Sequence, residues 1–211
     1  MVKVKVCGIT CVEDLNAAVE EGVDALGFVV DAPKSPRNLC LEKAAMLVSH
    51  VPIFVTSVLV TVAGDCETLV HMCRHVRPDA LQIHGDMQVT PLTLKKLVKG
   101  IKLIRAISVD DYGRIEFDDV QGFDAILVDS GNGHGGTGRV HDWNISRRIY
   151  ERCRLPFILA GGLNPNNVVD AIRAVRPYAV DVSTGVESFP GKKDRVMIAS
   201  FVRNAKVVSE R

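Results

Sequence analysis

The sequence predicts an α/β protein, a (β/α)8 TIM barrel formed as one domain over residues 1–211. Short apolar runs rich in β-branched residues alternate with helix-length segments of mixed polarity along the chain. There are about eight such runs, which is the strand count of this barrel. Polar and glycine residues follow most of these runs, and a barrel has its active site at the carboxyl ends of its strands.

The predicted strands are short and almost continuously apolar. Parallel strands covered by helices on both faces of a sheet typically show this pattern instead of strict alternation. The predicted strands are Val2–Val6, Ala25–Val29, Phe54–Val60, Ala80–Ile83, Leu103–Ala106, Ala125–Val128, Phe157–Leu159 and Ala179–Val182.

Helix start and stop signals lie between these runs. Pro91 is expected to open a helix over Leu92–Val98, because the first helical turn tolerates a missing N–H. Asn164 is expected to be the N-cap of a helix that covers Val168–Val175. Gly22 and Gly100 are expected where helices end, because glycine readily adopts the left-handed conformation there.

Composition and charge narrow the classes of partner. Hydrophobic residues make up 47% of the chain, charged residues make up 24%, and the net charge is +1. This balance is typical of a globular enzyme and predicts neither a nucleic-acid partner nor a membrane partner. We expect a phosphorylated small molecule as the partner, bound by a few local donors, and a protein that is a monomer or a homodimer.

The amino-terminal segment resembles a strand and not a targeting signal. Met1–Val6 alternates in polarity and lacks the charged region, apolar core and cleavage site of a signal peptide. The apolar runs are strand-sized and shorter than the roughly 20 residues of a membrane span. We therefore expect a cytoplasmic protein.

The chain has six cysteines, and no two form a Cys-x-x-Cys pair. Most cysteines in a reducing compartment are buried and inert, and that is the expectation for five of them. Cys7 is the exception because it ends the first predicted strand, directly before Gly8. A thiol near loop amides at a strand end can have a lowered pKa and act as a base or nucleophile.

Asp129 follows the sixth predicted strand and is the candidate acid. A cysteine and an aspartate on opposite sides of a barrel mouth form a plausible pair of general base and general acid. A simple loop cap is the alternative for Asp129. Arg37 follows Pro36 in a loop, and its planar fork suits a carboxylate or a phosphate, although most loop arginines are only solvated.

Two glycine-containing turns follow the seventh and eighth predicted strands. Barrels commonly build a phosphate site at this place from backbone N–H groups. Gly161 and Gly162 allow an anion to approach the backbone, and Ser183, Thr184 and Gly185 add hydroxyl and N–H donors. Either turn alone could be a plain connection, but two at adjacent strand ends favour phosphate binding.

Two motifs point to cofactors or metals but lack the required context. The Gly131–Gly136 stretch matches G-x-G-x-x-G, yet the next strand is not followed by an acidic residue for a ribose. His71 and His75 are four residues apart on a predicted helix, but no third ligand is evident. We therefore expect no metal and no organic cofactor.

Seven blocks around the predicted rim resemble the phosphoribosylanthranilate isomerase family. They occur in order over nearly the whole chain, and each block alone is a weak signal. The blocks are Val6–Thr10, Pro33–Arg37, Leu81–Gly85, Leu127–Ser130, Gly135–Gly138 with Asp142-Trp143, Ala160–Leu163 and Asp181–Glu187.

The resemblance implies an isomerase of tryptophan biosynthesis that carries out an Amadori rearrangement of N-(5-phosphoribosyl)anthranilate. It implies that Asp129 is the general acid and Cys7 the general base. It also implies that Arg37 meets the anthranilate and that the two glycine turns hold the phosphate. Gln82, His84 and Asp181 fall in the same family motifs, and we expect them to bind substrate.

Two other functions compete with this interpretation. A ribulose-phosphate epimerase or a related sugar-phosphate isomerase would also be a phosphate-binding barrel, but it would need histidines and aspartates as metal ligands at several strand ends. A barrel without catalytic activity could bind a phosphorylated metabolite or a partner. The strand ends offer Cys7 and one nearby histidine, His84, which disfavours the epimerase. The presence of both Cys7 and Asp129 argues against the inactive barrel.

Overall fold

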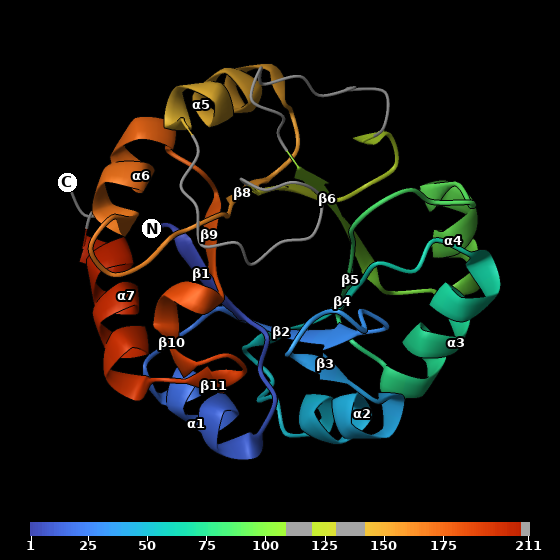
Figure 1. The fold of residues 1–211 in the computed structure, drawn as a ribbon. Helices are drawn as coiled ribbons and strands as arrows, with labels where there is room; N and C mark the ends of the chain where they lie inside the picture. The colour runs from blue at the N-terminus through green and yellow to red at the C-terminus, as the bar shows by residue number, and fades with distance from the viewer. Residues whose placement is uncertain (109–119, 130–141, 208–211) are drawn as a thin grey trace.

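The computed structural model describes residues 1–108, 120–129 and 142–207. Its centre is a ring of eight parallel strands, which closes because β1 pairs with both β2 and β9. Figure 1 looks into this ring, with the helices around its outside. The predicted barrel is thereby confirmed. The strands are β1 (Lys3–Cys7), β2 (Ala25–Val30), β4 (Thr56–Thr61), β5 (Ala80–Ile83), β6 (Lys102–Ser108), β7 (Ala125–Asp129), β8 (Phe157–Leu159) and β9 (Ala179–Val182).

The helices pack on the outside of the ring and follow the strands in sequence. Neighbouring helices contact one another around the barrel, as α5 does with α6 and α6 with α7. The helices in the described part of the chain are α1 (Val12–Glu20), α2 (Leu41–Ser49), α3 (Cys66–Val76), α4 (Pro91–Leu97), α5 (Trp143–Arg152), α6 (Val168–Val175) and α7 (Arg195–Val207). None of these helices is long and apolar enough to cross a membrane.

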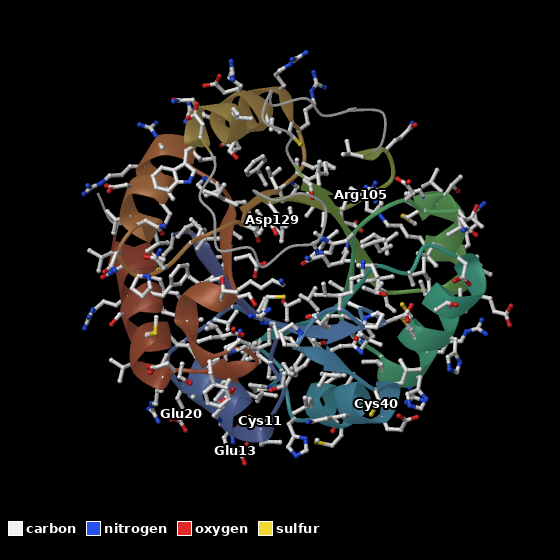
Figure 2. All side chains as sticks on the ribbon, in the orientation of Figure 1. Cys11, Glu13, Glu20, Cys40, Arg105 and Asp129 are labelled. Atoms are coloured by element: carbon white, nitrogen blue, oxygen red, sulfur yellow. The ribbon has the colours of Figure 1, made fainter. Side chains whose placement is uncertain are left out.

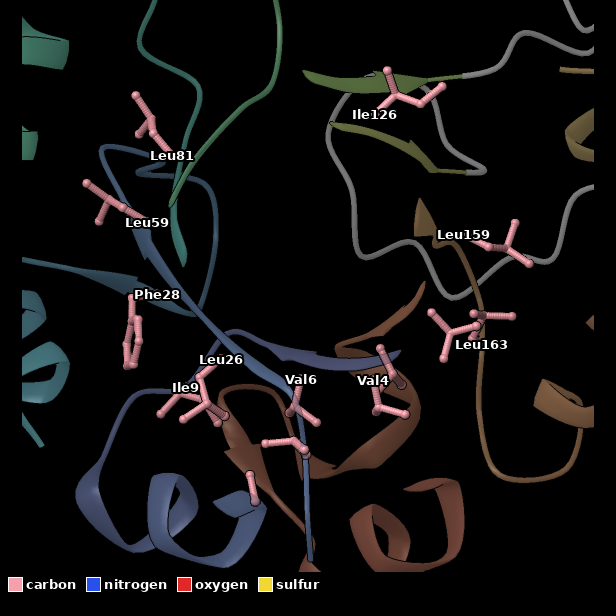
Figure 3. Packing of buried hydrophobic residues seen from close by; sticks show 14 of the residues in the cluster. Val4, Val6, Ile9, Leu26, Phe28, Leu59, Leu81, Ile126, Leu159 and Leu163 are labelled. Carbon is pink, nitrogen blue, oxygen red and sulfur yellow. The ribbon is translucent and has the colours of Figure 1, made fainter. Parts of the chain in front are cut away.

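Each strand turns alternate side chains toward two different layers. Val4 and Val6 of β1 pack outward into the main apolar core between strands and helices. Figure 3 shows Val6, Leu26 and Ile9 close together in this layer. The other side of β1 carries Lys5 and Cys7, and Cys7 belongs to a separate, smaller cluster of apolar side chains from several strands inside the ring.

Three short elements add to the barrel, and the strand pattern does not predict them. β3 (Asn38–Leu39) pairs with β2 beside the ring. A single 3₁₀ turn, η2 (Thr184–Val186), follows β9. An antiparallel hairpin of β10 (Glu187–Phe189) and β11 (Lys192–Lys193) comes next and leads into α7.

Several predicted boundaries differ from the structure by one to three residues, and two of the differences have an evident cause. β4 begins at Thr56 and not at Phe54, because Val55 N–H donates to the carbonyl of Pro52 and closes a turn. Phe54 is 94% exposed in that turn. The N-cap position of α6 is Asn167 and not Asn164, because a turn precedes the helix. Asn164 stabilises that turn instead, and its Oδ1 accepts from the N–H of Asn166 at 2.9 Å.

Other local predictions are confirmed. Pro91 is the first residue of α4, and the Thr90 side chain caps this helix by accepting from Thr93 N–H. Gly22 and Gly100 adopt φ values of +83° and +88° after α1 and α4, so glycine suits both positions. The Gly131–Gly136 motif lies outside the described residues, so its prediction is not tested.

Two leucines of α4 test how the helices hold the barrel together. Leu94 is completely buried, whereas Leu92 is 60% exposed on the same helix. We expect Leu94→Ala to lower the free energy of unfolding by about 2–5 kcal/mol, because it removes buried methyl groups and leaves a cavity. We expect Leu92→Ala to change it by about 0.5 kcal/mol or less. Urea unfolding measures both, and equal losses would contradict this packing.

Candidate active site

A pocket opens at the carboxyl ends of the barrel strands, where the polar rim was predicted. Seven of the predicted site residues line it, and they come from strands on all sides of the ring or from the segments that directly follow. They are Cys7, Arg37, Gln82, His84, Asp129, Asp181 and Ser183. Figure 2 shows Asp129 on the inner side of the ring of helices, whereas Cys11 and Cys40 lie toward the outside.

Cys7 is the last residue of β1, and a glycine on the neighbouring strand leaves space for its thiol. Gly8 adopts φ +78°, and the N–H groups of Gly8 and Ile9 both donate to the carbonyl of Gly27 on β2. Gly27 is also the in-register partner of Cys7. A Cβ at Gly27 would lie 2.7 Å from Cys7 Sγ, so glycine is required at this position for the thiol to occupy its place.

The electrostatic environment of Cys7 differs from the expectation of a thiol acidified by loop amides. Burial is the largest influence and raises the pKa of the Cys7 thiol. Asp181 acts in the same direction, whereas the ammonium groups of Lys5 and Lys193 lower this pKa. Burial outweighs both cations, so the pKa of Cys7 lies above its ordinary value.

Lys5 and Asp181 form a buried ion pair below Cys7. The two residues are in-register partners on β1 and β9, and Lys5 Nζ lies 3.0 Å from Asp181 Oδ1. Their side chains are only 4% and 9% exposed. Asp181 was predicted to bind substrate, and in the structure it faces the pocket while it also neutralises Lys5.

A second buried ion cluster connects Arg37 to the β10–β11 hairpin. Arg37 donates to Glu187 through Nε at 2.8 Å and through Nη2 at 2.5 Å. Lys193 Nζ lies 2.8 Å from Glu187 Oε1 and 3.1 Å from the carbonyl oxygen of Ser183. Burial acts to raise the pKa of Glu187, but the hydrogen bonds from Arg37 and Lys193 outweigh it and hold that pKa below its ordinary value.

The sequence interpretation missed three of these buried groups as site residues. Glu187 lies in a family block without an assigned role, while Lys193 and Lys5 had none. One signal could have pointed to Lys5: of the two lysines on the first strand, it is the one nearer to Cys7, and it has the same parity as Cys7. Glu187 and Lys193 carry no such local signal, because the short hairpin that buries them is not evident from the strand pattern.

Gln82 and His84 form a neighbouring polar pair at the end of β5. Gln82 Nε2 and His84 Nε2 are 2.9 Å apart. Within the described residues, Gln82 Oε1 is buried and has no hydrogen-bond partner. Burial, reinforced by the charges of Lys5 and Arg105, lowers the pKa of His84 to about 4. His84 is therefore uncharged at about pH 7 and can exchange hydrogen bonds there without carrying a charge.

The two glycine turns lie against each other beside the pocket. Gly161 and Gly162 adopt φ values of +89° and +64°, which favour glycine. A Cβ at Gly185 would lie 1.9 Å from the carbonyl oxygen of Leu163, so glycine is needed where the second turn meets the first. Ser183 lines the pocket, whereas the other four residues predicted to bind phosphate do not: Gly161, Gly162, Thr184 and Gly185, all of them half-buried.

The low pKa of His84 makes folding stability depend on pH. The folded chain resists protonation of His84 until about pH 4, while the unfolded chain takes up this proton near pH 6.5. This difference contributes up to about 3 kcal/mol to the free energy of unfolding above about pH 6.5, and the contribution is lost as the pH falls to about 4.

Unfolding free energies measured by urea titration across this pH range test the effect. We expect His84→Gln to remove that part of the pH dependence. His71→Gln changes an exposed histidine of α3 and serves as the matched control, so it should keep the wild-type slope. Parallel curves for the wild type and His84→Gln would show that His84 titrates normally.

Comparison with known proteins agrees with this geometry. The family model described as N-(5′-phosphoribosyl)anthranilate (PRA) isomerase matches residues 4–204. A relative from Halobacterium salinarum, named N-(5′-phosphoribosyl)anthranilate isomerase, is 43% identical over 211 residues, which cover 97% of this chain and 96% of the relative.

Solved structures give the same result for the fold. A phosphoribosyl anthranilate isomerase in complex with reduced 1-(o-carboxyphenylamino)-1-deoxyribulose 5-phosphate superposes with a TM-score of 0.82 at 40% identity. The match covers 98% of this chain and 100% of that one. Monomers generated from the dimeric enzyme of Thermotoga maritima match with a TM-score of 0.81 at 35% identity, covering 98% and 100% of the two chains.

The family model covers nearly the whole chain, and the barrel carries its rim residues into one pocket. The chain belongs to the N-(5′-phosphoribosyl)anthranilate isomerase family.

Proposed function

We propose that this chain isomerises N-(5′-phosphoribosyl)anthranilate in tryptophan biosynthesis, with Asp129 as general acid and Cys7 as general base. The observation that carries the proposal is that Cys7 and Asp129 line one pocket from β1 and β7, which are separated by β8 and β9 around the ring. A substrate between them would meet one group on each side. The product is 1-(2-carboxyphenylamino)-1-deoxyribulose 5-phosphate.

The acid step opens the sugar ring. Asp129 in its protonated form donates a proton to the furanose ring oxygen, and the bond from this oxygen to C1′ breaks. The lone pair of the anthranilate nitrogen forms a double bond to C1′, which gives an iminium ion. The substrate nitrogen therefore accepts the positive charge that develops as the ring opens. A carboxylic acid placed at the ring oxygen accelerates such a step by proton transfer.

The base step completes the isomerisation. The Cys7 thiolate removes the C2′ proton, so that an S–H bond forms and the C–H bond breaks. The electron pair forms the C1′–C2′ double bond and restores the nitrogen lone pair. The resulting enolamine loses its C2′ hydroxyl proton and gains a proton at C1′, which yields the ketone. Cys7 then returns its proton to solvent and Asp129 takes one up.

Arg37, Gln82, His84 and Asp181 are proposed to position the substrate. Arg37 uses Nε and Nη2 on Glu187, so Nη1 is the edge of its fork that would meet the anthranilate carboxylate. Gln82 Oε1 is a buried acceptor that can take a hydrogen bond from a sugar hydroxyl. Asp181 is held by Lys5 at the floor of the same pocket and can accept another.

The paired glycine turns are proposed to hold the substrate phosphate. Two observations support this: Ser183 lines the pocket, and the second turn meets the first where a Cβ at Gly185 would strike the carbonyl oxygen of Leu163. Backbone N–H groups and hydroxyls at such turns bind phosphate oxygens without a cofactor. The ligand named for the similar solved structure also carries a 5-phosphate, which agrees with this assignment.

The two proposed catalytic groups are tested by removal. We expect Cys7→Ala and Asp129→Ala each to lower kcat by a factor on the order of 10² or more, because each removes a proton-transfer group. Cys40→Ala and Asp170→Ala change an exposed cysteine and an exposed aspartate, and they should retain wild-type turnover. Near-normal turnover by either of the first two variants would refute the role assigned to that residue.

The assay generates the labile substrate in place from anthranilate and phosphoribosyl pyrophosphate with the transferase that joins them. Loss of anthranilate-type fluorescence then reports isomerisation. The wild-type chain should accelerate this loss in proportion to its concentration. A rate that does not depend on the chain would contradict the proposed activity itself.

The phosphate site is tested at Gly185. A side chain there would strike the carbonyl of Leu163 and separate the two turns, so we expect Gly185→Ala to raise KM by a factor on the order of 10. Competitive inhibition by inorganic phosphate should weaken in parallel. Gly100→Ala changes a glycine after α4 whose added Cβ meets open space, and it should alter neither constant. An unchanged phosphate inhibition constant in Gly185→Ala would refute this site.

A further inference from the structure

Cys7 lies within a buried group of charges, of which Lys5, Lys193 and Glu187 have no role in the proposed reaction. Lys5 and Lys193 interact electrostatically with the thiol, and so does Arg37. Two carboxylates hold these cations: Asp181 pairs with Lys5, and Glu187 pairs with both Arg37 and Lys193. Three cations therefore face two carboxylates in the immediate surroundings of Cys7.

Lys5 is the cation with the most direct relation to Cys7. It precedes Cys7 by two residues on β1, so both side chains point to the inside of the ring. Its side chain is 4% exposed, and its ammonium both hydrogen-bonds to Asp181 and interacts with the Cys7 thiol. Asp181 on β9 fixes this ammonium from the neighbouring strand, because the register places the two residues side by side.

The other charged or titratable groups that face the pocket have other partners or lie farther from Cys7 around the ring. His84 after β5 is uncharged at about pH 7, because its pKa is about 4. Arg105 on β6 donates to the carbonyl of Gly85, and its charge acts on His84. Asp129 on β7 is the proposed proton donor, and β8 and β9 separate its strand from β1. Lys193 is held by Glu187 and Ser183 on the hairpin side.

A buried ammonium that is paired with only one carboxylate in a group with surplus positive charge favours a further anion nearby. The Cys7 thiolate would be such an anion, since Lys5 and Lys193 both favour ionisation of this thiol. Of the charged groups around Cys7, Lys5 has the largest effect on its ionisation, larger than the opposing effect of Asp181.

We propose that Lys5 is a positioning residue for the base: its ammonium, held in place by Asp181, stabilises the Cys7 thiolate that removes the C2′ proton. The inference rests on the proposed function, in which Cys7 is that base. It also gives Asp181 a second task, since this carboxylate fixes Lys5 below the thiol in addition to any contact with substrate.

The test measures ionisation of Cys7 without relying on turnover. The rate of Cys7 alkylation by iodoacetamide is followed as a function of pH, with the modified peptide resolved by mass spectrometry. Only the thiolate reacts, so the rate reports the ionised fraction. Cys40 is exposed and lies away from the pocket, so its alkylation in the same sample is the internal reference.

Lys5→Met should slow Cys7 alkylation by a factor on the order of 10 below the midpoint and shift the midpoint to higher pH. Asp181→Asn keeps an Oδ1 that can accept from Lys5 but removes the negative charge that opposes ionisation of Cys7, so it should shift the midpoint the opposite way, to lower pH. Lys3→Met is the matched control, because the Lys3–Asp24 pair lies two residues earlier on β1 but at the surface. It should leave the Cys7 profile unchanged.

The double variant Lys5→Met/Asp181→Asn leaves no buried ion unpaired, so it tests the idea even where the single variant unfolds. The midpoint of Cys7 alkylation should shift to higher pH, but by less than in Lys5→Met, because the effect of Lys5 on the thiol exceeds that of Asp181. In the substrate assay, Lys5→Met should lower kcat with little change in KM, and Lys5→Arg should recover part of the loss.

Two results would overturn the inference. One is a Cys7 profile in Lys5→Met, or in the double variant, that matches the wild type. The other is a shift in the same direction for Lys5→Met and Asp181→Asn, which would indicate a general disturbance of the pocket and not an effect of charge. Either result leaves the proposed function intact, since that is tested separately by the turnover of Cys7→Ala and Asp129→Ala and by the dependence of the assay on the chain.

Discussion

The closure of the barrel through β1 is the constraint on which the site depends. β1 pairs with β2, the next strand along the chain, and also with β9, the last strand of the ring. The pairing with β2 sets Cys7 opposite Gly27, which leaves room for the thiol. The pairing with β9 sets Lys5 opposite Asp181. A shift of one residue in either register would turn Cys7 and Lys5 into the apolar layer under the helices.

The site combines buried charge with exposed backbone at neighbouring strand ends. Burial makes Cys7 a weak acid, and the cations around it offset part of that cost. Burial, reinforced by the charges of Lys5 and Arg105, holds His84 in its uncharged form. The glycine turns after β8 and β9 contribute no charge, so the anion they are proposed to bind would be recognised by hydrogen bonds. Acid–base chemistry and phosphate binding are thus assigned to separate parts of one rim.

Local patterns in the sequence predict the barrel and much of its rim, but not the support beneath the rim. Cys7 and Asp129 stand at the ends of apolar runs, and the glycine turns are recognisable from their own residues. Neither signal requires knowledge of contacts with distant parts of the chain. The ion pair of Lys5 with Asp181 joins residues 176 positions apart, and that of Arg37 with Glu187 joins residues 150 apart. Such pairs follow from strand register and from the β10–β11 hairpin, neither of which is visible in a single sequence. The predicted start of β4 at Phe54 is wrong for a related reason, because an apolar residue in a surface turn resembles the start of a strand in the sequence.

The central claim is that a base at Cys7 carries the C2′ hydrogen away as a proton. A substrate with deuterium at C2′ tests it most directly, when a single turnover in ordinary water is followed by mass spectrometry of the product. Because a thiol exchanges its proton with solvent, the account predicts that deuterium is lost to water and is absent from C1′ of the product. Product that retains the deuterium at C1′ would indicate direct hydride migration, which needs no base, and would contradict the account.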